Sequence, residues 1–79
     1  MRTFISEIRV CIPKGGEVPK FKDTDICEGV FQSQEPVELE ASNCSFNMCY
    51  FDNVDPVGAT GFEKCHCSDR TKWHGKMPK

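Results

Sequence analysis

Apolar and polar residues alternate along the first stretch of the chain. In residues 3–12, Ile8, Val10 and Ile12 fall on one side of an extended backbone, while the residues between them fall on the other. Alternation with a period of two is typical of a strand that is buried on one face. The pattern therefore predicts a strand in this stretch.

A second alternating region covers residues 36–51 and contains the tripeptide Ala-Ser-Asn near its middle. Polar positions on its first arm are taken by Glu38 and Glu40, which are expected to point outward. Serine and asparagine favour turns, so the chain is expected to reverse near Ser42–Asn43. The region predicts an antiparallel hairpin.

The other segments are shorter or less regular. Residues 13–20 are rich in proline and glycine and predict a loop. Residues 24–31 fit either one short helical turn near 24–29 or a strand that opens at Gly29. Residues 52–61 have the composition of a loop, and residues 62–67 fit a last short strand. Residues 68–79 form a polar, basic C-terminal tail.

Composition supports strands over helices. The chain has six Val, four Ile and six Phe, against one Leu and two Ala. Residues of the first group fit a pleated surface, whereas leucine and alanine are strong helix formers. These patterns predict no internal repeat. The expected fold is a small, disulfide-rich, mostly β domain of 1–79 with an antiparallel sheet and room for one short helix near residues 24–29.

Cysteine content gives the strongest indication of class. A chain of 79 residues has a marginal core, and its six cysteines are an even number at high density. Three disulfides in an oxidising compartment are expected, which implies a secreted protein whose signal peptide has been removed. Fifteen pairings are open. The expected disulfide residues are Cys11, Cys27, Cys44, Cys49, Cys65 and Cys67.

The pair Cys65 and Cys67 would share one face of a strand, about 7 Å apart. That separation is too long for a disulfide, so two different distant partners are expected. His66 would face the other way, which argues against a cysteine–histidine catalytic pair. The alternative is a zinc-binding intracellular adaptor, with ligands drawn from Cys44, Cys49, Cys65, Cys67 and His74.

Charge is segregated along the chain, although the net charge is only −2. Residues 1–22 carry +3, residues 23–55 carry −8 with no lysine or arginine, and residues 64–79 carry +4. The basic tail contains the only tryptophan, and tryptophan and arginine often carry interface energy. The expected partner-binding residues are Arg70, Lys72, Trp73 and Lys76.

Several classes of function lack a signature in this sequence. No catalytic constellation, phosphate-binding loop, calcium loop or membrane-spanning apolar run is found, and the acidic net charge disfavours nucleic acid. No enzyme activity, cofactor or bound metal is therefore expected. Composition and cysteine content resemble those of secreted cysteine-rich effectors, toxins and inhibitors. The sequence predicts a monomer that acts by binding a host or prey protein.

Overall fold

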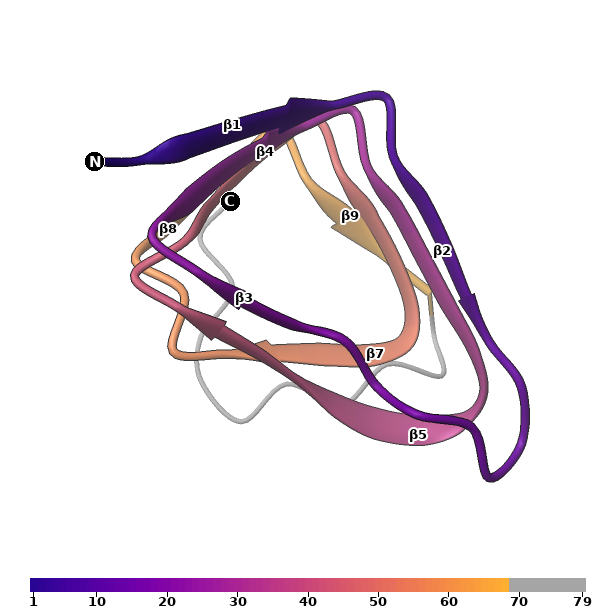
Figure 1. Cartoon of the computed structure of the whole chain (residues 1–79). Helices are drawn as coiled ribbons and strands as arrows, with labels where there is room; N and C mark the ends of the chain where they lie inside the picture. The colour runs from indigo at the N-terminus through magenta and orange to yellow at the C-terminus, as the bar shows by residue number, and fades with distance from the viewer. Residues whose placement is uncertain (69–79) are drawn as a thin grey trace.

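The part of the chain that the structure describes winds through four stacked coils with a roughly triangular outline (Figure 1). The computed structural model describes residues 1–68. Every strand pairing between the coils is parallel, and the described residues contain no helix. This arrangement is a β-solenoid, in which each coil contacts the coils before and after it.

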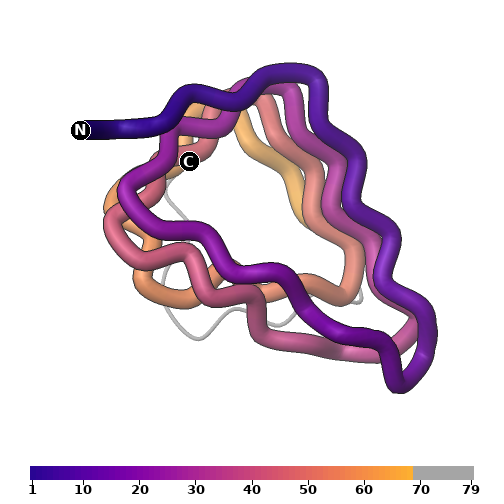
Figure 2. Tube along the Cα trace, in the orientation of Figure 1, coloured from indigo at the N-terminus to yellow at the C-terminus, as the bar shows by residue number. Residues whose placement is uncertain are grey.

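Within residues 1–68, nine strands build the four coils. The first coil holds three of them, and each later coil holds two. Figure 2 shows the coils stacked one behind another. In chain order they are β1 (Thr3–Ser6), β2 (Arg9–Ile12), β3 (Lys20–Lys22), β4 (Thr24–Cys27), β5 (Val30–Ser42), β6 (Ser45–Asn47), β7 (Tyr50–Val57), β8 (Gly61–Glu63) and β9 (His66–Cys67).

Three faces surround the interior. The first face is the sheet β1-β4-β6-β8. The second face belongs to the sheet β2-β5-β7-β9 and consists of β2, the first parts of β5 and β7, and β9. The third face is formed by β3 and the later parts of β5 and β7, because β5 is long enough to continue around a corner. The register moves by 21, 20 and 16 residues from coil to coil, as the column Ile5, Ile26, Phe46 and Phe62 shows.

Residues with positive φ turn the chain at the corners. Glu7, Glu28, Met48 and Lys64 have φ between 55° and 57° and occupy the same corner in the four coils. Each lies directly after a strand of the first face. The backbone N–H groups of Glu7, Glu28 and Met48 donate hydrogen bonds to backbone carbonyl oxygens of the following coil. A left-handed residue changes the chain direction without breaking the stacking of the coils, although it costs an L-residue about 1–2 kcal/mol.

Phenylalanine fills the interior. Phe31, Phe46 and Phe51 are at most 1% exposed. Phe31 stacks on Phe51 at 5.2 Å between ring centroids, and Phe46 stacks on Phe62 at 5.6 Å. The two stacks meet edge to face, with Phe46 and Phe51 5.2 Å apart. Aromatic pairs at such distances add about 0.5–1.5 kcal/mol beyond the burial of their area.

The parallel solenoid overturns the predicted antiparallel fold. The two arms expected to form a hairpin in residues 36–51 do not pair with each other: β5 pairs with β7, and β6 pairs with β4 and β8. Asn43 does turn the chain, with φ of 55°, but into the next face of the solenoid. Alternation alone does not distinguish these outcomes, because it records only which side of a strand is buried.

Four local expectations are also wrong. Residues 3–12 and 62–67, each predicted to form one strand, are divided by corners at Glu7 and Lys64 into β1 and β2 and into β8 and β9. Residues 24–29, considered for a short helix, contain β4, and the predicted loop at 52–61 contains most of β7. Asp52, Asn53 and Asp55 suggested a loop, yet parallel pairing with β5 holds them in a strand around a corner.

The predicted disulfide framework is absent as well. All six cysteines lie within the described residues, and all six are free thiols. Cys44 and Cys49 are buried in the core at 0% and 1% exposure, where they act as small apolar side chains. The phenylalanine stacks and the backbone ladders therefore take the place that three disulfides were expected to fill.

Replacing Phe46 by Ala should lower the free energy of unfolding by about 3–5 kcal/mol, because it removes a ring that contacts both stacks. Urea denaturation followed by circular dichroism measures the change. The control is Phe4→Ala, since Phe4 is 70% exposed and its loss should change stability by less than about 0.5 kcal/mol. Equal effects of the two substitutions would contradict the assigned core.

Replacing Glu28 by Gly should leave the stability unchanged or raise it by up to about 1 kcal/mol, because glycine relieves the positive φ of 56°. The matched control is Glu40→Gly, an exposed glutamate within β5, where glycine should cost about 0.5–1 kcal/mol. Thermal and urea denaturation compare the two variants. A loss at position 28 as large as that at position 40 would show that the corner conformation is wrong.

Candidate functional site

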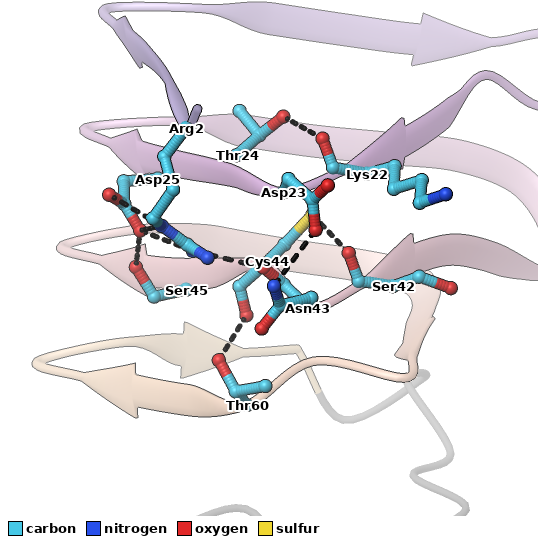
Figure 3. A network of polar contacts seen from close by, with 10 residues as sticks. All are labelled: Arg2, Lys22, Asp23, Thr24, Asp25, Ser42, Asn43, Cys44, Ser45 and Thr60. Atoms are coloured by element: carbon cyan, nitrogen blue, oxygen red, sulfur yellow. Dashed lines mark hydrogen bonds and ion pairs between the residues drawn. The ribbon is translucent and has the colours of Figure 1, made fainter.

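A polar network ties the first three coils together at the corner between the third and first faces (Figure 3). Arg2 Nη2 donates to Asp25 Oδ1 at 2.7 Å, and Ser45 Oγ donates to the same oxygen at 2.6 Å. Asn43 Nδ2 donates to Asp23 Oδ1 at 2.8 Å. Each carboxylate in this cluster has a hydrogen-bond partner from another coil, so the network serves to hold neighbouring coils together.

The network changes the ionisation of Asp25. Hydrogen bonds from Arg2 and Ser45 lower the pKa of Asp25 to about 2, with the bond from Arg2 making the larger contribution. The same contact raises the pKa of Arg2. Both side chains are about 40% exposed, so water and salt screen the pair strongly.

A second set of side chains forms a more suitable surface for binding. Val30, Tyr50 and His66 lie in register on adjacent strands of the second face, and Arg9 extends this column at the first coil. Their side chains point outward, because the residues that follow them in β5 and β7, Phe31 and Phe51, are buried.

The corner residues form a parallel column beside this one. Met48 is 45% exposed and Tyr50 is 38% exposed, and only the buried Cys49 separates them along the chain. Glu28 and Lys64 flank Met48 in the coils on either side. We refer to these outward residues together as the Tyr50 surface: Arg9, Glu28, Val30, Met48, Tyr50, Lys64 and His66.

Part of the Tyr50 surface consists of residue types that are common in protein interfaces. Its apolar middle consists of Val30, Met48 and Tyr50, and charged or titratable groups lie at both ends. Tyrosine, methionine and arginine are enriched in interfaces. The backbone beneath them is held by hydrogen bonds between coils, such as Tyr50 N to Gly29 O at 2.8 Å and Met48 N to Glu63 O at 2.8 Å. Little ordering of the scaffold would be needed on binding.

The residues predicted to bind a partner are not among those that the structure describes. Arg70, Lys72, Trp73 and Lys76 lie outside residues 1–68, as does His74 of the zinc alternative. Of the basic tail at 68–79, only Ser68 is described, and its hydroxyl donates to Asp52 Oδ1 at 2.6 Å. Binding by the tail stays a prediction.

The cysteines of the zinc alternative are distributed over different parts of the interior. Cys44 precedes β6, Cys49 and Cys65 lie at the corner between the first and second faces, and Cys67 ends β9. Within residues 1–68, no three His, Cys, Asp or Glu side chains gather closely enough to hold a metal ion. In the same residues, no helix is long and apolar enough to cross a membrane.

Sequence reasoning missed the Tyr50 surface because it missed the repeat. The signal is present in "ICEGVF" (26–31), "FNMCYF" (46–51) and "FEKCHC" (62–67), which place apolar, corner and outward residues at the same positions. Comparisons with models of protein families, with curated proteins and with solved structures give no significant match to this chain.

The carboxyl group of Asp25 should titrate with a midpoint near pH 2, which can be followed by the NMR chemical shift of its carboxyl carbon. Because the pKa is lower in the folded state than the ordinary value of 3.8, ionised Asp25 stabilises the fold above about pH 4, and this contribution is lost as the pH falls towards 2. Arg2→Ala should return the midpoint towards 3.8. An unchanged midpoint in that variant would show that the contact is absent.

Proposed function

We propose that this protein is a binding module that recognises a segment of another protein through the Tyr50 surface. The observation that supports the proposal most directly is the exposure of Tyr50 and Met48 at adjacent outward positions of a rigid ladder. Isolated exposed apolar residues are common, but Tyr50 lies in register with Val30 and is two residues from Met48, so the three occupy one part of the surface.

The distribution of charge suggests what kind of segment would bind. Arg9 and Glu28 lie on the side of the first coils, and Lys64 and His66 lie on the side of the last coil, so the rim has both signs of charge. A partner would bury apolar side chains against Tyr50 and Met48 and place polar groups around them. Such binding depends mainly on buried apolar area and should be only weakly sensitive to salt.

The expected effector, toxin or inhibitor role is a narrower form of the same proposal. Secretion was inferred from a disulfide framework that the structure does not contain, so secretion stays a prediction without that support. Binding through the basic tail is the competing proposal. It differs in a measurable way, since contacts made by Arg70, Lys72 and Lys76 would weaken markedly as salt is raised.

The test uses the full chain as bait for a displayed library of random peptides, followed by affinity measurements on the selected peptides. Tyr50→Ala should weaken binding by about 30-fold, which corresponds to about 2 kcal/mol at a central aromatic residue. Raising the salt concentration from about 50 to about 500 mM should weaken binding by less than about threefold.

Val57→Ala is the matched control, because Val57 is also on β7 and is 39% exposed, close to the 38% of Tyr50. It should leave the affinity unchanged. If Trp73→Ala abolishes binding while Tyr50→Ala does not, the tail is the partner surface and the proposal is wrong. Equal losses from Val57→Ala and Tyr50→Ala would also overturn it.

A further inference from the structure

Two free thiols lie one above the other in the last two coils. β7 and β9 pair with Tyr50 opposite His66, so the preceding residues, Cys49 and Cys65, occupy the same position in successive coils. The backbone at this point is fixed by a hydrogen bond from His66 N to Cys49 O of 2.9 Å. Cys49 is buried and Cys65 is half-buried.

The two thiols also have equivalent surroundings. Cys49 Sγ lies 3.5 Å from the carbonyl oxygen of Asn47 and 3.6 Å from that of Ile26 in the coil before. Cys65 Sγ lies 3.4 Å from the carbonyl oxygen of Glu63 and 3.5 Å from that of Phe46 in the coil before. The side chains therefore enter the interior in the same direction, and each thiol is close enough to shift the pKa of the other.

The spacing of this pair is within the reach of a disulfide. Neighbouring strands lie about 4.8 Å apart, and a disulfide joins Cα atoms that are about 4.4–6.8 Å apart. We propose that Cys49 and Cys65 form a thiol pair that reacts with low-molecular-weight disulfides, with Cys65 as the attacking thiol and Cys49 as the resolving thiol. This inference does not depend on the function proposed for the Tyr50 surface.

The order of the two thiols follows from accessibility and ionisation. Cys65 is the more exposed of the two, so a small disulfide reaches it first. Contact with the Cys49 thiol lowers the pKa of Cys65, and the same contact, together with burial, raises the pKa of Cys49. The thiolate is the nucleophile in exchange, so Cys65 is also the thiol that ionises first.

The exchange has two balanced steps. The Cys65 thiolate attacks one sulfur of the small disulfide, forms a mixed disulfide and releases the other half as a thiolate, which takes up the proton that Cys65 lost. Cys49 then gives up its proton and attacks the sulfur of Cys65, which releases the second half as a thiol. Two protein thiols are oxidised, and one small disulfide is reduced to two thiols.

The pair differs from the three-disulfide framework that the sequence suggested. It joins only the third and fourth coils, and it leaves Cys11, Cys27, Cys44 and Cys67 as thiols. Of these, Cys11 and Cys27 point outward on different faces, in register with Gln32 and Asn47, and Cys44 is in the core near Ser42. The reduced protein is folded, so the bond is an optional modification of it.

The reaction is tested on the reduced full chain with glutathione disulfide, under native conditions and, in parallel, in concentrated urea. Remaining thiols are alkylated after denaturation, and the protein is digested with trypsin and chymotrypsin. Phe46 and Tyr50 bracket Cys49, so its peptide is separated from those of Cys27 and Cys44. Fragmentation of the peptide that contains both Cys65 and Cys67 distinguishes these two.

The native sample should become two hydrogen atoms lighter and contain the Cys49–Cys65 bond, at least tenfold enriched over any other pair. The urea sample should contain a mixture. Cys49→Ala should instead accumulate glutathione on Cys65, because no resolving thiol remains, whereas Cys65→Ala should accumulate little. The matched control Cys11→Ala should behave like the unaltered chain.

A different dominant pair in the native sample would overturn the proposal, as would oxidation that occurs only in urea. Both outcomes are read on the unaltered chain, so they do not depend on whether a variant folds. If glutathione collects on Cys49 in the Cys65→Ala variant as fast as on Cys65 in the Cys49→Ala variant, the assigned roles of the two thiols are wrong.

Discussion

Parallel pairing between successive coils decides which side chains of this protein meet. Once β4, β6 and β8 are in register, Ile26, Phe46 and Phe62 must stack in the interior. The same ladders place Val30, Tyr50 and His66 in one outward column. The core, the Tyr50 surface and the thiol pair are therefore consequences of one set of backbone hydrogen bonds. A shift of one residue would exchange inward and outward positions along a whole strand.

The corners are what allow this pairing to persist. Glu7, Glu28, Met48 and Lys64 hold the same left-handed conformation, so the chain turns from the first face to the second at an equivalent residue in each of the described coils. Elsewhere the coils differ: four residues of β5 lie between Gln32 and Val37, whereas only Asn53 lies between their partners Asp52 and Val54 in β7. Variation in coil length is thus confined to other parts of the coil, and the corner next to Tyr50 keeps its geometry.

Part of the fold could be predicted from the sequence. The abundance of β-branched and aromatic residues correctly indicates strands, and alternation in residues 3–12 correctly places Ile12 in the interior. Strand direction could not be read in this way, because parallel and antiparallel strands both alternate. The sequence feature that best indicates stacked coils is the spacing between Phe31 and Phe51, which equals the length of one full coil. The corners could not be predicted either, because Met48 and the equivalent residues adopt positive φ although they are not glycine.

The number of cysteines led to a wrong prediction of three disulfides, for a related physical reason. A small domain needs disulfides when its core is too small, but stacked coils bury phenylalanines from adjacent turns against one another and satisfy the backbone within the ladders. Cysteine then fits the interior as a small apolar side chain, as Cys44 and Cys49 show. The Cys49–Cys65 pair lies directly behind Met48, Tyr50 and His66, because adjacent residues point in opposite directions. A bond between these thiols would fasten the last coil to the third beneath the Tyr50 surface, where the register already holds the two coils together.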